Sequence, residues 1–299
     1  MKKVILAALA VVAMASCAKH QSAEGAITAP EEINFTSGVD SRVSGDQWVE
    51  GDKIGVLAIS ENDNAPDADF TYENIMYSAD QGGSSTSFSL GEGQTPIIDE
   101  QQCGMYILAY YPYNEDYEDL SDDIFNISDQ TDLEALIHMS AEAMVEAGET
   151  QVDLTFEHSM AKVQFNVSCK ASLGTLEGMS FAMSNVQTAG NVFQAGSLND
   201  DTAVYGTIDS AVIDFADDFS TASIEMVLFT TGYYSTKAEL IFSFGDSAPY
   251  TASFFVTLTA GQIHSYNVII GADEVEVSGA VITDWGKIDG GELDTEQAS

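Results

Sequence analysis

The feature that most constrains this chain is a long series of short segments in which apolar and polar residues alternate. A period of two places every second side chain on the same face, which predicts strands with one buried face. In the first third of the chain these segments fall near residues 33–36, 54–60, 70–78, 86–90 and 104–111. The pattern resumes after residue 150, with turns between the segments. The sequence therefore predicts an all-β fold of antiparallel strands rather than parallel α/β units.

Residues 129–144 have the best helical spacing in the chain. Leu133, Leu136, Ile137 and Met144 lie roughly on one helical face. The same stretch also fits a helical turn followed by an extended edge strand. We expect at most one short helix, which leaves no room for repeated βαβ crossovers.

The length of 299 residues is sufficient for two domains that each bury a hydrophobic core. We expect β-sandwiches at residues 33–153 and 154–288, with the boundary near the turn at Gly148. Residues 17–32 are small and polar and are predicted to form a linker, and residues 289–299 form an acidic tail.

The chain is strongly acidic, with a formal net charge of −39. Nucleic-acid phosphates require a basic surface, and anionic lipid attracts basic segments, so both are excluded as electrostatic partners. The charge is typical of a soluble surface that repels its own copies.

The first residues form an export signal. Two lysines precede an apolar stretch at residues 4–13 that is too short to span a bilayer, and small residues lead up to Cys17. This pattern is typical of a bacterial lipoprotein signal, so we expect residues 1–16 to be removed and Cys17 to be acylated, with palmitate among the acyl chains. An ordinary secretory signal with an incidental cysteine is the other interpretation.

The residue types that support catalysis or metal binding are scattered. His20, His138, His158 and His264 have no ligand partner two to four positions on, and no catalytic or phosphate-binding motif is present. The acidic loop at residues 61–69 lacks the spacing of a calcium-binding EF-hand. We expect no enzyme activity, no cofactor and no metal site.

The remaining two cysteines and most of the tyrosines near residue 110 are expected to be buried in the fold. Cys103 and Cys169 fall in separate predicted strands, so free, buried thiols are expected rather than a disulfide. Alternation predicts that Tyr106 and Tyr110 face the core and that Tyr111 faces outward.

Five motifs recur in an order that resembles the fimbrillin family, the lipoprotein-derived pilins of type V pili. They are W-x-x-G-D-x-I-G at 48–55, A-Y-Y-P-Y at 109–113, F-x-H-x-M-A-K-V at 156–163, A-G-Q-x-x-x-Y at 260–266 and I-T-D-W at 282–285. The resemblance covers nearly the whole chain that follows the signal. It implies two transthyretin-like β-sandwich domains in tandem and export to the outer membrane as a lipoprotein.

The resemblance also implies a processing step. In shaft subunits of that family, an arginine-specific protease cuts in the loop after the first strand, and a C-terminal strand of the next subunit fills the vacated groove. Arg42 is the only arginine in this chain, and Gly38 to Gly45 form a loop of small residues, so the mature protein is expected to begin at Val43. An incidental surface arginine, or one that only forms an ion pair, is the other interpretation.

The predicted donor segment lies near the C-terminus. Its apolar residues are Val275, Val277, Val281, Ile282 and Trp285. Burial of five such side chains would contribute on the order of 10 kcal/mol before ordering costs. Alternation alone fits equally a last strand that packs on its own domain.

The function predicted from the sequence is that of a structural fimbrial subunit, or a fimbria-associated surface lipoprotein, that assembles by strand exchange and mediates adhesion. The expected partners are other fimbrial subunits, the outer membrane through the N-terminal lipid, and a host glycan or protein. The alternative is a monomeric surface lipoprotein that binds host protein or glycan without polymerising.

Overall fold

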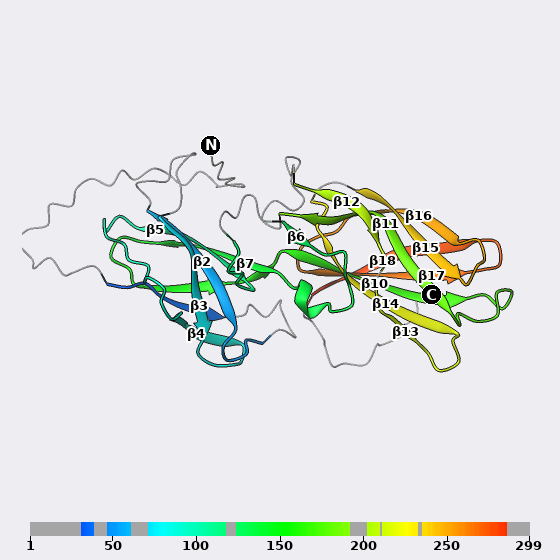
Figure 1. Ribbon diagram of the computed structural model, residues 1–299, viewed down its shortest axis with the longest axis horizontal. Helices are drawn as coiled ribbons and strands as arrows, with labels where there is room; N and C mark the ends of the chain where they lie inside the picture. The colour runs from blue at the N-terminus through cyan, green and yellow to red at the C-terminus, as the bar shows by residue number, and fades with distance from the viewer. Residues whose placement is uncertain are drawn as a thin grey trace, which may run out of the picture.

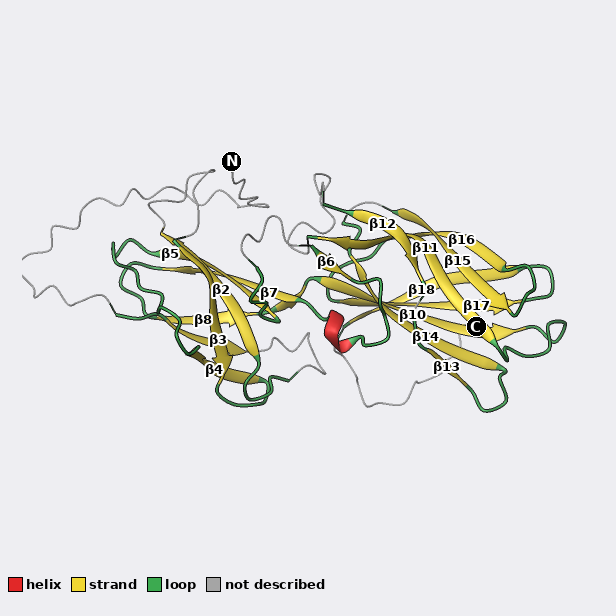
Figure 2. Ribbon diagram, in the orientation of Figure 1, coloured by secondary structure: helices red, strands yellow, loops and turns green. Residues whose placement is uncertain are grey.

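The computed structural model describes residues 31–38, 47–60, 71–117, 124–191, 202–209, 211–232 and 235–285. The strands form two groups that lie end to end along the long axis of the molecule (Figure 1). Among the described residues, the one helical element is the 3-10 turn η2 (Glu134–Leu136), drawn red in Figure 2. The prediction of an all-β fold is therefore confirmed.

The first group is a single sheet of eight strands in the order β8-β1-β4-β3-β2-β5-β7-β9. Its strands are β1 (Asn34–Gly38), β2 (Lys53–Ser60), β3 (Tyr72–Ala79), β4 (Ser85–Leu90), β5 (Met105–Tyr111), β7 (Met139–Val145), β8 (Gln151–Thr155) and β9 (Glu157–His158). A short turn joins β7 to β8, which stand near opposite ends of this order. The sheet therefore curls until its ends meet and encloses its own core.

Trp48 lies at the centre of this first core. Its indole ring contacts Phe88, Tyr111 and Phe156 edge-on, with ring centroids 5.2, 5.5 and 5.3 Å away. Gly51 follows in the left-handed region at φ 91°, where glycine has no steric penalty, and turns the chain into β2. The turn after Trp48 thus fixes where β2 enters the core.

The second group consists of two sheets that share one core. One sheet has the order β13-β14-β10-β17-β18, and the other has the order β12-β11-β15-β16, with β6 also paired to β11. The strands are β6 (Phe125–Asn126), β10 (Met160–Cys169), β11 (Met179–Gly190), β12 (Val204–Ile208), β13 (Ile213–Phe215), β14 (Thr221–Phe229), β15 (Thr236–Phe244), β16 (Tyr250–Val256), β17 (Gln262–Ile270) and β18 (Val275–Asp284). Phe165 of β10 and Phe181 of β11 meet between the sheets at 5.6 Å.

The helix considered for residues 129–144 is absent. Only η2 is helical, and Met139–Val145 extends as β7 and pairs with β5 along its whole length. Met144, placed on the helix face by its spacing, is 53% exposed. Long-range pairing with the edge of β5 outweighs the local helical spacing, and the alternative of a helical turn followed by an extended edge strand describes the structure.

The chain crosses between the two cores more than once. Ile127 and Leu136 belong to the second core, although β5 before them and β7 after them belong to the first sheet. Phe156 is the last residue of the first core, and from Met160 onward the buried apolar residues belong to the second. The expected boundary between residues 153 and 154 lies within β8.

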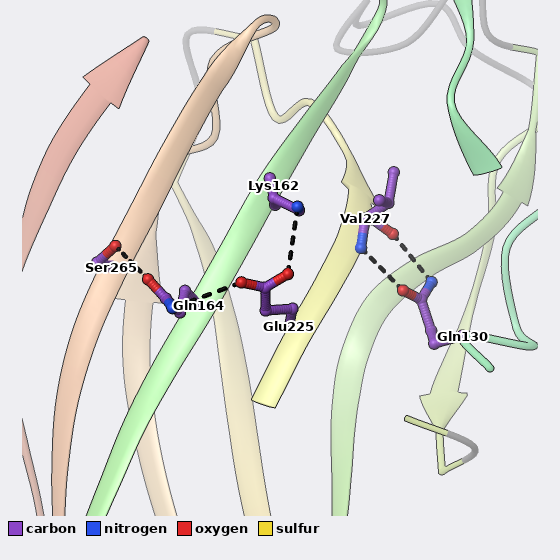
Figure 3. A network of polar contacts seen from close by, with 6 residues as sticks. All are labelled: Gln130, Lys162, Gln164, Glu225, Val227 and Ser265. Carbon is purple, nitrogen blue, oxygen red and sulfur yellow. Dashed lines mark hydrogen bonds and ion pairs between the residues drawn. The ribbon is translucent and has the colours of Figure 1, made fainter. Parts of the chain in front are cut away.

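Gln130 anchors the crossing segment to the second group (Figure 3). Its Nε2 atom donates to the carbonyl oxygens of Ile127 and Val227 at 2.7 and 2.9 Å, and its Oε1 atom accepts from the Val227 amide at 2.8 Å. The neighbouring strand β13 pairs with β14 only as far as Ile224. The buried side chain of Gln130 therefore covers the edge of β14 where the neighbouring strand has ended.

Candidate functional site

The first strand of the described fold occupies an interior position in its sheet. β1 pairs antiparallel with β4 and parallel with β8, so both of its backbone edges are hydrogen-bonded. Just before it, the Ile33 amide donates to the Ile97 carbonyl at 2.9 Å. A chain that lost β1 would expose the facing edges of β4 and β8, because no described strand replaces it there.

The inward side of β1 is deeply buried. Ile33, Phe35 and Ser37 are each at most 1% exposed, and Phe35 contacts the Tyr77 ring edge-on at 5.0 Å. Phe35 lies opposite Phe88 on one side and Val152 on the other. Each large side chain buried in this way contributes about 1.5–3 kcal/mol. The position of β1 is therefore an apolar trench lined by both neighbouring strands.

The predicted processing and lipidation residues lie outside the described part of the chain. Arg42 and Val43 fall between Gly38, where β1 ends, and Gln47, where the description resumes. Cys17, the predicted lipidation site, precedes residue 31, where the description begins. The structure thus describes the strand before the predicted cut and not the cut itself.

The last strand, β18, stands at the end of its sheet. It pairs antiparallel with β17 along one edge, and within the described residues its other edge has no strand partner. The predicted donor residues differ in burial along this strand. Val275 and Val277 pack partly against the second core, Val281 and Ile282 are 62% and 54% exposed, and Trp285 is buried.

The three described histidines do not gather into a metal site. Among the residues described, no group of three histidine, cysteine or acidic side chains could hold an ion. His138, His158 and His264 are all buried. Burial lowers the pKa of His138 to about 3, and its Nδ1 atom lies 3.1 Å from Ser159 Oγ. His158 lies in β9, at the end of the first sheet's strand order, and its ring stacks on Trp285.

The prediction for the tyrosines of β5 holds in part, because Tyr106 and Tyr110 are buried as expected but Tyr111, expected to face outward, packs against the first core. Tyr111 packs against Trp48 in the first core, together with Met105, Ile107 and Ala109 of the same face. Tyr110 lies on the other face, where its hydroxyl donates to Asn74 Oδ1 at 2.6 Å. β5 is buried on both faces, so alternation of residue types could not tell which face adjoins the core.

The two described cysteines are free thiols. Cys103 and Cys169 are each partly buried rather than fully buried. The Cys103 thiol donates to the Gln101 carbonyl, and the Cys169 thiol to the Gly174 carbonyl. They lie in different strand groups and form no crosslink between them.

Several features of the site depend on residues far apart in sequence. The parallel pairing of β1 with β8 joins residues more than a hundred positions apart. The stacking of His158 on Trp285 and the ion pairs of Lys170 with Glu274 and Glu276 are similarly distant. Single-sequence patterns carry no signal for such pairs, although the I-T-D-W motif had marked Trp285.

Comparison with known proteins identifies the family. Residues 41–285 match the profile of the fimbrillin-like family. The chain therefore belongs to the fimbrillin-like family, whose members are non-enzymatic structural proteins of the cell surface associated with fimbriae and adhesion. The expectation of a non-enzymatic fimbrillin is confirmed. A search of curated protein sequences gave no match.

Solved structures share the fold. A proposed cell adhesion protein from Bacteroides uniformis is 24% identical, with a TM-score of 0.60 over 86% of this chain and 98% of the other. One from Bacteroides ovatus is 24% identical, with a TM-score of 0.62 over 86% and 99%. One from Parabacteroides distasonis is 9% identical, with a TM-score of 0.51 over 86% and 98%. No helix in the described residues is long and apolar enough to cross a membrane.

Proposed function

We propose that this chain is a structural fimbrial subunit, or a fimbria-associated surface lipoprotein, that assembles by strand exchange and mediates adhesion. The observation that carries the proposal is the position of β1, which is paired along both edges and buried along its inward face. Removal of such a strand leaves unpaired backbone and an apolar trench, and this combination is a template for a strand from another molecule.

The processing point in this mechanism is Arg42. A cut between Arg42 and Val43 separates β1 from the rest of the fold, because β1 ends at Gly38 and the next described strand begins at Lys53. After the cut only non-covalent contacts retain β1. The released piece would carry Cys17 and its lipid, while the remainder would keep the open trench.

The donor in this mechanism is the segment that holds Val275, Val277, Val281, Ile282 and Trp285. As the terminal strand of its sheet, β18 can leave without breaking any pairing except that with β17. Donor and acceptor positions lie in different strand groups of one chain. The contact is therefore head-to-tail, and such contacts extend into filaments instead of closing.

The finer features of the family belong to the same proposal. We assign the two strand groups to tandem transthyretin-like domains that meet near residues 153–160. Cys17 anchors the precursor in the outer membrane by its acyl chains, since more than one chain is needed for stable anchoring. The partners are other fimbrial subunits and, at the exposed fibre surface, a host glycan or protein.

The main experiment uses an arginine-specific protease on the lipid-free precursor, because Arg42 is the chain's only arginine. We expect a single cut, a new N-terminus at Val43, loss of the β1 peptide and growth of fibres in electron micrographs. Arg42→Lys keeps the charge but resists this protease and should remain monomeric. A nicked protein that sheds β1 and still stays monomeric would overturn the assembly mechanism.

A second experiment tests the donor strand separately. The double variant Val281→Asp/Ile282→Asp changes side chains that are exposed in the single chain, so the monomer should stay folded. In the trench of a neighbour one of these two adjacent carboxylates would face the core, because successive side chains of a strand point to opposite faces, so fibre growth should cease. Val204→Asp/Tyr205→Asp on β12 alters a comparably exposed pair outside the donor strand. This control should still form fibres.

One observation favours the monomeric alternative. Before any cut, β1 fills its own sheet and β18 pairs with β17, so the intact chain offers no vacant strand position between β4 and β8. In that form the chain would act as a surface lipoprotein that binds host protein or glycan. The protease experiment separates the two functions, because only strand exchange makes fibre growth depend on the cut at Arg42.

A further inference from the structure

β18 is loosely held in its middle. Two residues, Gly279 and Ala280, stand opposite the single Tyr266 of β17, because the pairing shifts between Ser278 and Val281. Such a bulge interrupts the hydrogen-bond ladder. The residues that follow, Val281 and Ile282, are mostly exposed, although Ile282 lies opposite the buried His264. Neither face of this stretch contributes much burial.

The start of β18 is held by an ionic contact. Lys170, just after β10, places its Nζ atom 2.6 Å from Glu274 Oε1 and 2.5 Å from Glu276 Oε1. These two hydrogen-bonded carboxylates raise the pKa of Lys170 to about 12. The Gly271 amide also donates to the Glu274 carbonyl at 2.8 Å, which closes the turn that leads into the strand.

The end of β18 is held by an aromatic contact. The Trp285 ring lies parallel to the His158 ring, with centroids 4.2 Å apart and planes 4° apart. The Trp285 amide donates to the Gly261 carbonyl at 2.7 Å, and Lys162 Nζ lies 5.8 Å from the centre of the indole. Lys162 also pairs with Glu225 at 3.2 Å in the network of Figure 3, which links β10 to β14.

His158 belongs to the first sheet. It lies in β9, opposite Met139 of β7, and the carbonyl of the neighbouring His138 accepts from the Ser159 amide at 2.9 Å. Trp285 follows the last strand of the second group. The stacked pair therefore joins the end of β18 to the other strand group, across the junction of the two cores.

We propose that β18 is retained in its own sheet by two end contacts, Lys170 with Glu274 and Glu276 at its start and Trp285 on His158 at its end. The second contact makes release of the strand depend on the junction between the two strand groups. His158 acts as a positioning residue in this device, since it holds Trp285 and takes no part in pairing β18 with β17. Both end contacts lie within a single chain and do not require assembly.

The two contacts respond differently to salt. The Lys170 pair is exposed, so counter-ions screen it at high ionic strength. The stacked rings are buried, and their contact does not depend on net charge. Release of the strand should therefore begin at its start when salt is raised, while its end stays in place.

Amide hydrogen exchange on the full chain after signal removal tests the proposal, because exchange reports local opening. Trp285→Ala should speed exchange at residues 281–284 by about tenfold, the size expected for a lost aromatic pair, and should also speed it at 138–140 and 157–159. Lys170→Met should speed exchange at residues 275–278 by a few-fold in low salt, with no difference from the parent protein at high salt.

Matched variants separate these effects from general loosening. Trp285→Phe keeps a ring that can stack on His158, so its exchange rates should be close to those of the parent protein. Tyr205→Ala removes an exposed aromatic ring on β12, and Lys53→Met removes a lysine from the first sheet. Neither should change exchange in β18. Unchanged exchange in β18 for both Trp285→Ala and Lys170→Met would overturn the proposal, as would equal loosening of β10 and β14 in both variants.

The role of the device in assembly rests on the proposed function. His158→Ala weakens the end contact without altering the donor segment, so protease-cut protein should form fibres after a shorter lag. Faster exchange at residues 281–284 without a shorter lag would confine the device to the single chain and refute its role in assembly. Absence of fibres from every variant, the parent included, would refute strand exchange, and the exchange data would still decide whether the two contacts hold β18.

Discussion

β1 and β18, the first and last strands of the described fold, are held in opposite ways. β1 has a strand on each side and a fully buried inward face. β18 has one neighbour, a bulge and two exposed apolar residues in succession. A strand of the first kind leaves a deep vacancy when it is lost, while a strand of the second kind can depart with little disturbance. The proposed acceptor and donor roles require these two properties respectively.

The comparison also indicates what the proposed cut at Arg42 would change. The buried face of β1 makes spontaneous departure unfavourable, so an uncut subunit is protected from strands of its neighbours. Cleavage does not weaken any contact of β1, but it turns an intramolecular strand into a separate ligand that can diffuse away. In the proposed mechanism, cleavage of one loop would therefore be sufficient to open the position of β1 to a strand from another subunit.

The largest expected effect concerns the buried side of β1. Phe35→Ala should lower the free energy of unfolding by about 3–5 kcal/mol, because it removes a buried ring and leaves a cavity beside Tyr77. Phe255→Ala on the edge strand β16 makes the same change at a residue that is 71% exposed, and should alter stability by less than about 0.5 kcal/mol. Urea unfolding measures both. Similar losses would remove the contrast between interior and edge strands.

The next largest effect concerns Gln130, whose side chain covers the open edge of β14 as the backbone of β1 covers the facing edges of β4 and β8. Gln130→Met keeps the volume of the side chain but leaves the buried amide and carbonyl of Val227 without their partner. We expect a loss of about 2–3 kcal/mol in the same urea assay. Gln164→Met, which alters a partly exposed contact with Glu225, is the control and should cost less. An equal loss in the two variants would show that the edge of β14 needs no cover.

The dependence of stability on pH tests the buried state of His138, which lies near the junction of the two strand groups. The folded chain holds His138 neutral, with its pKa lowered by burial to about 3, whereas the unfolded chain protonates it near pH 6.5. This contribution to stability is complete above pH 6.5 and is lost as the pH falls toward 3. The loss per pH unit grows as the unfolded histidine becomes protonated, approaches about 1.4 kcal/mol per pH unit near pH 5, and amounts to about 2 kcal/mol by that pH. His138→Asn should flatten the slope between pH 6.5 and 5, and an unchanged slope would contradict the assignment.

The smallest expected effect is a substitution on β18, which tests whether this strand is held more loosely than an interior strand. Val281→Asp alone should change the stability of the uncut monomer by less than about 0.5 kcal/mol, since the side chain is already in contact with water. Val268→Asp on β17, the strand next to β18, introduces the same charge at a fully buried position and should unfold the second core. Circular dichroism during thermal unfolding compares them. A large loss in Val281→Asp would mean that β18 is held as firmly as an interior strand.

Much of the fold followed from alternation of residue types. The segments expected near 33–36, 54–60 and 86–90 are strands within one or two residues of the predicted bounds. Two errors share one cause. The helix considered for residues 139–145 and the outward position expected for Tyr111 both failed because β5 is covered on both sides, and no local pattern encodes how many neighbours a strand will have.

The candidate site divides in the same way. The motif at Trp48 and the alternation of Ile33 and Phe35 marked a first strand that enters a core, and the terminal I-T-D-W marked Trp285. The sequence could not show that β1 lies between β4 and β8, or that Trp285 stacks on His158. The pairing of β1 with β8 and the stacking of Trp285 on His158 each join residues more than a hundred positions apart.

By itself, the sequence determined the all-β class, the positions of most strands and the family, because each depends on residue types at short spacing. Tertiary structure alone decided which strand is interior and which is at an edge. That distinction depends on which backbone edges meet after the chain has folded back on itself, and a strand has the same alternation whether it gains one neighbour or two.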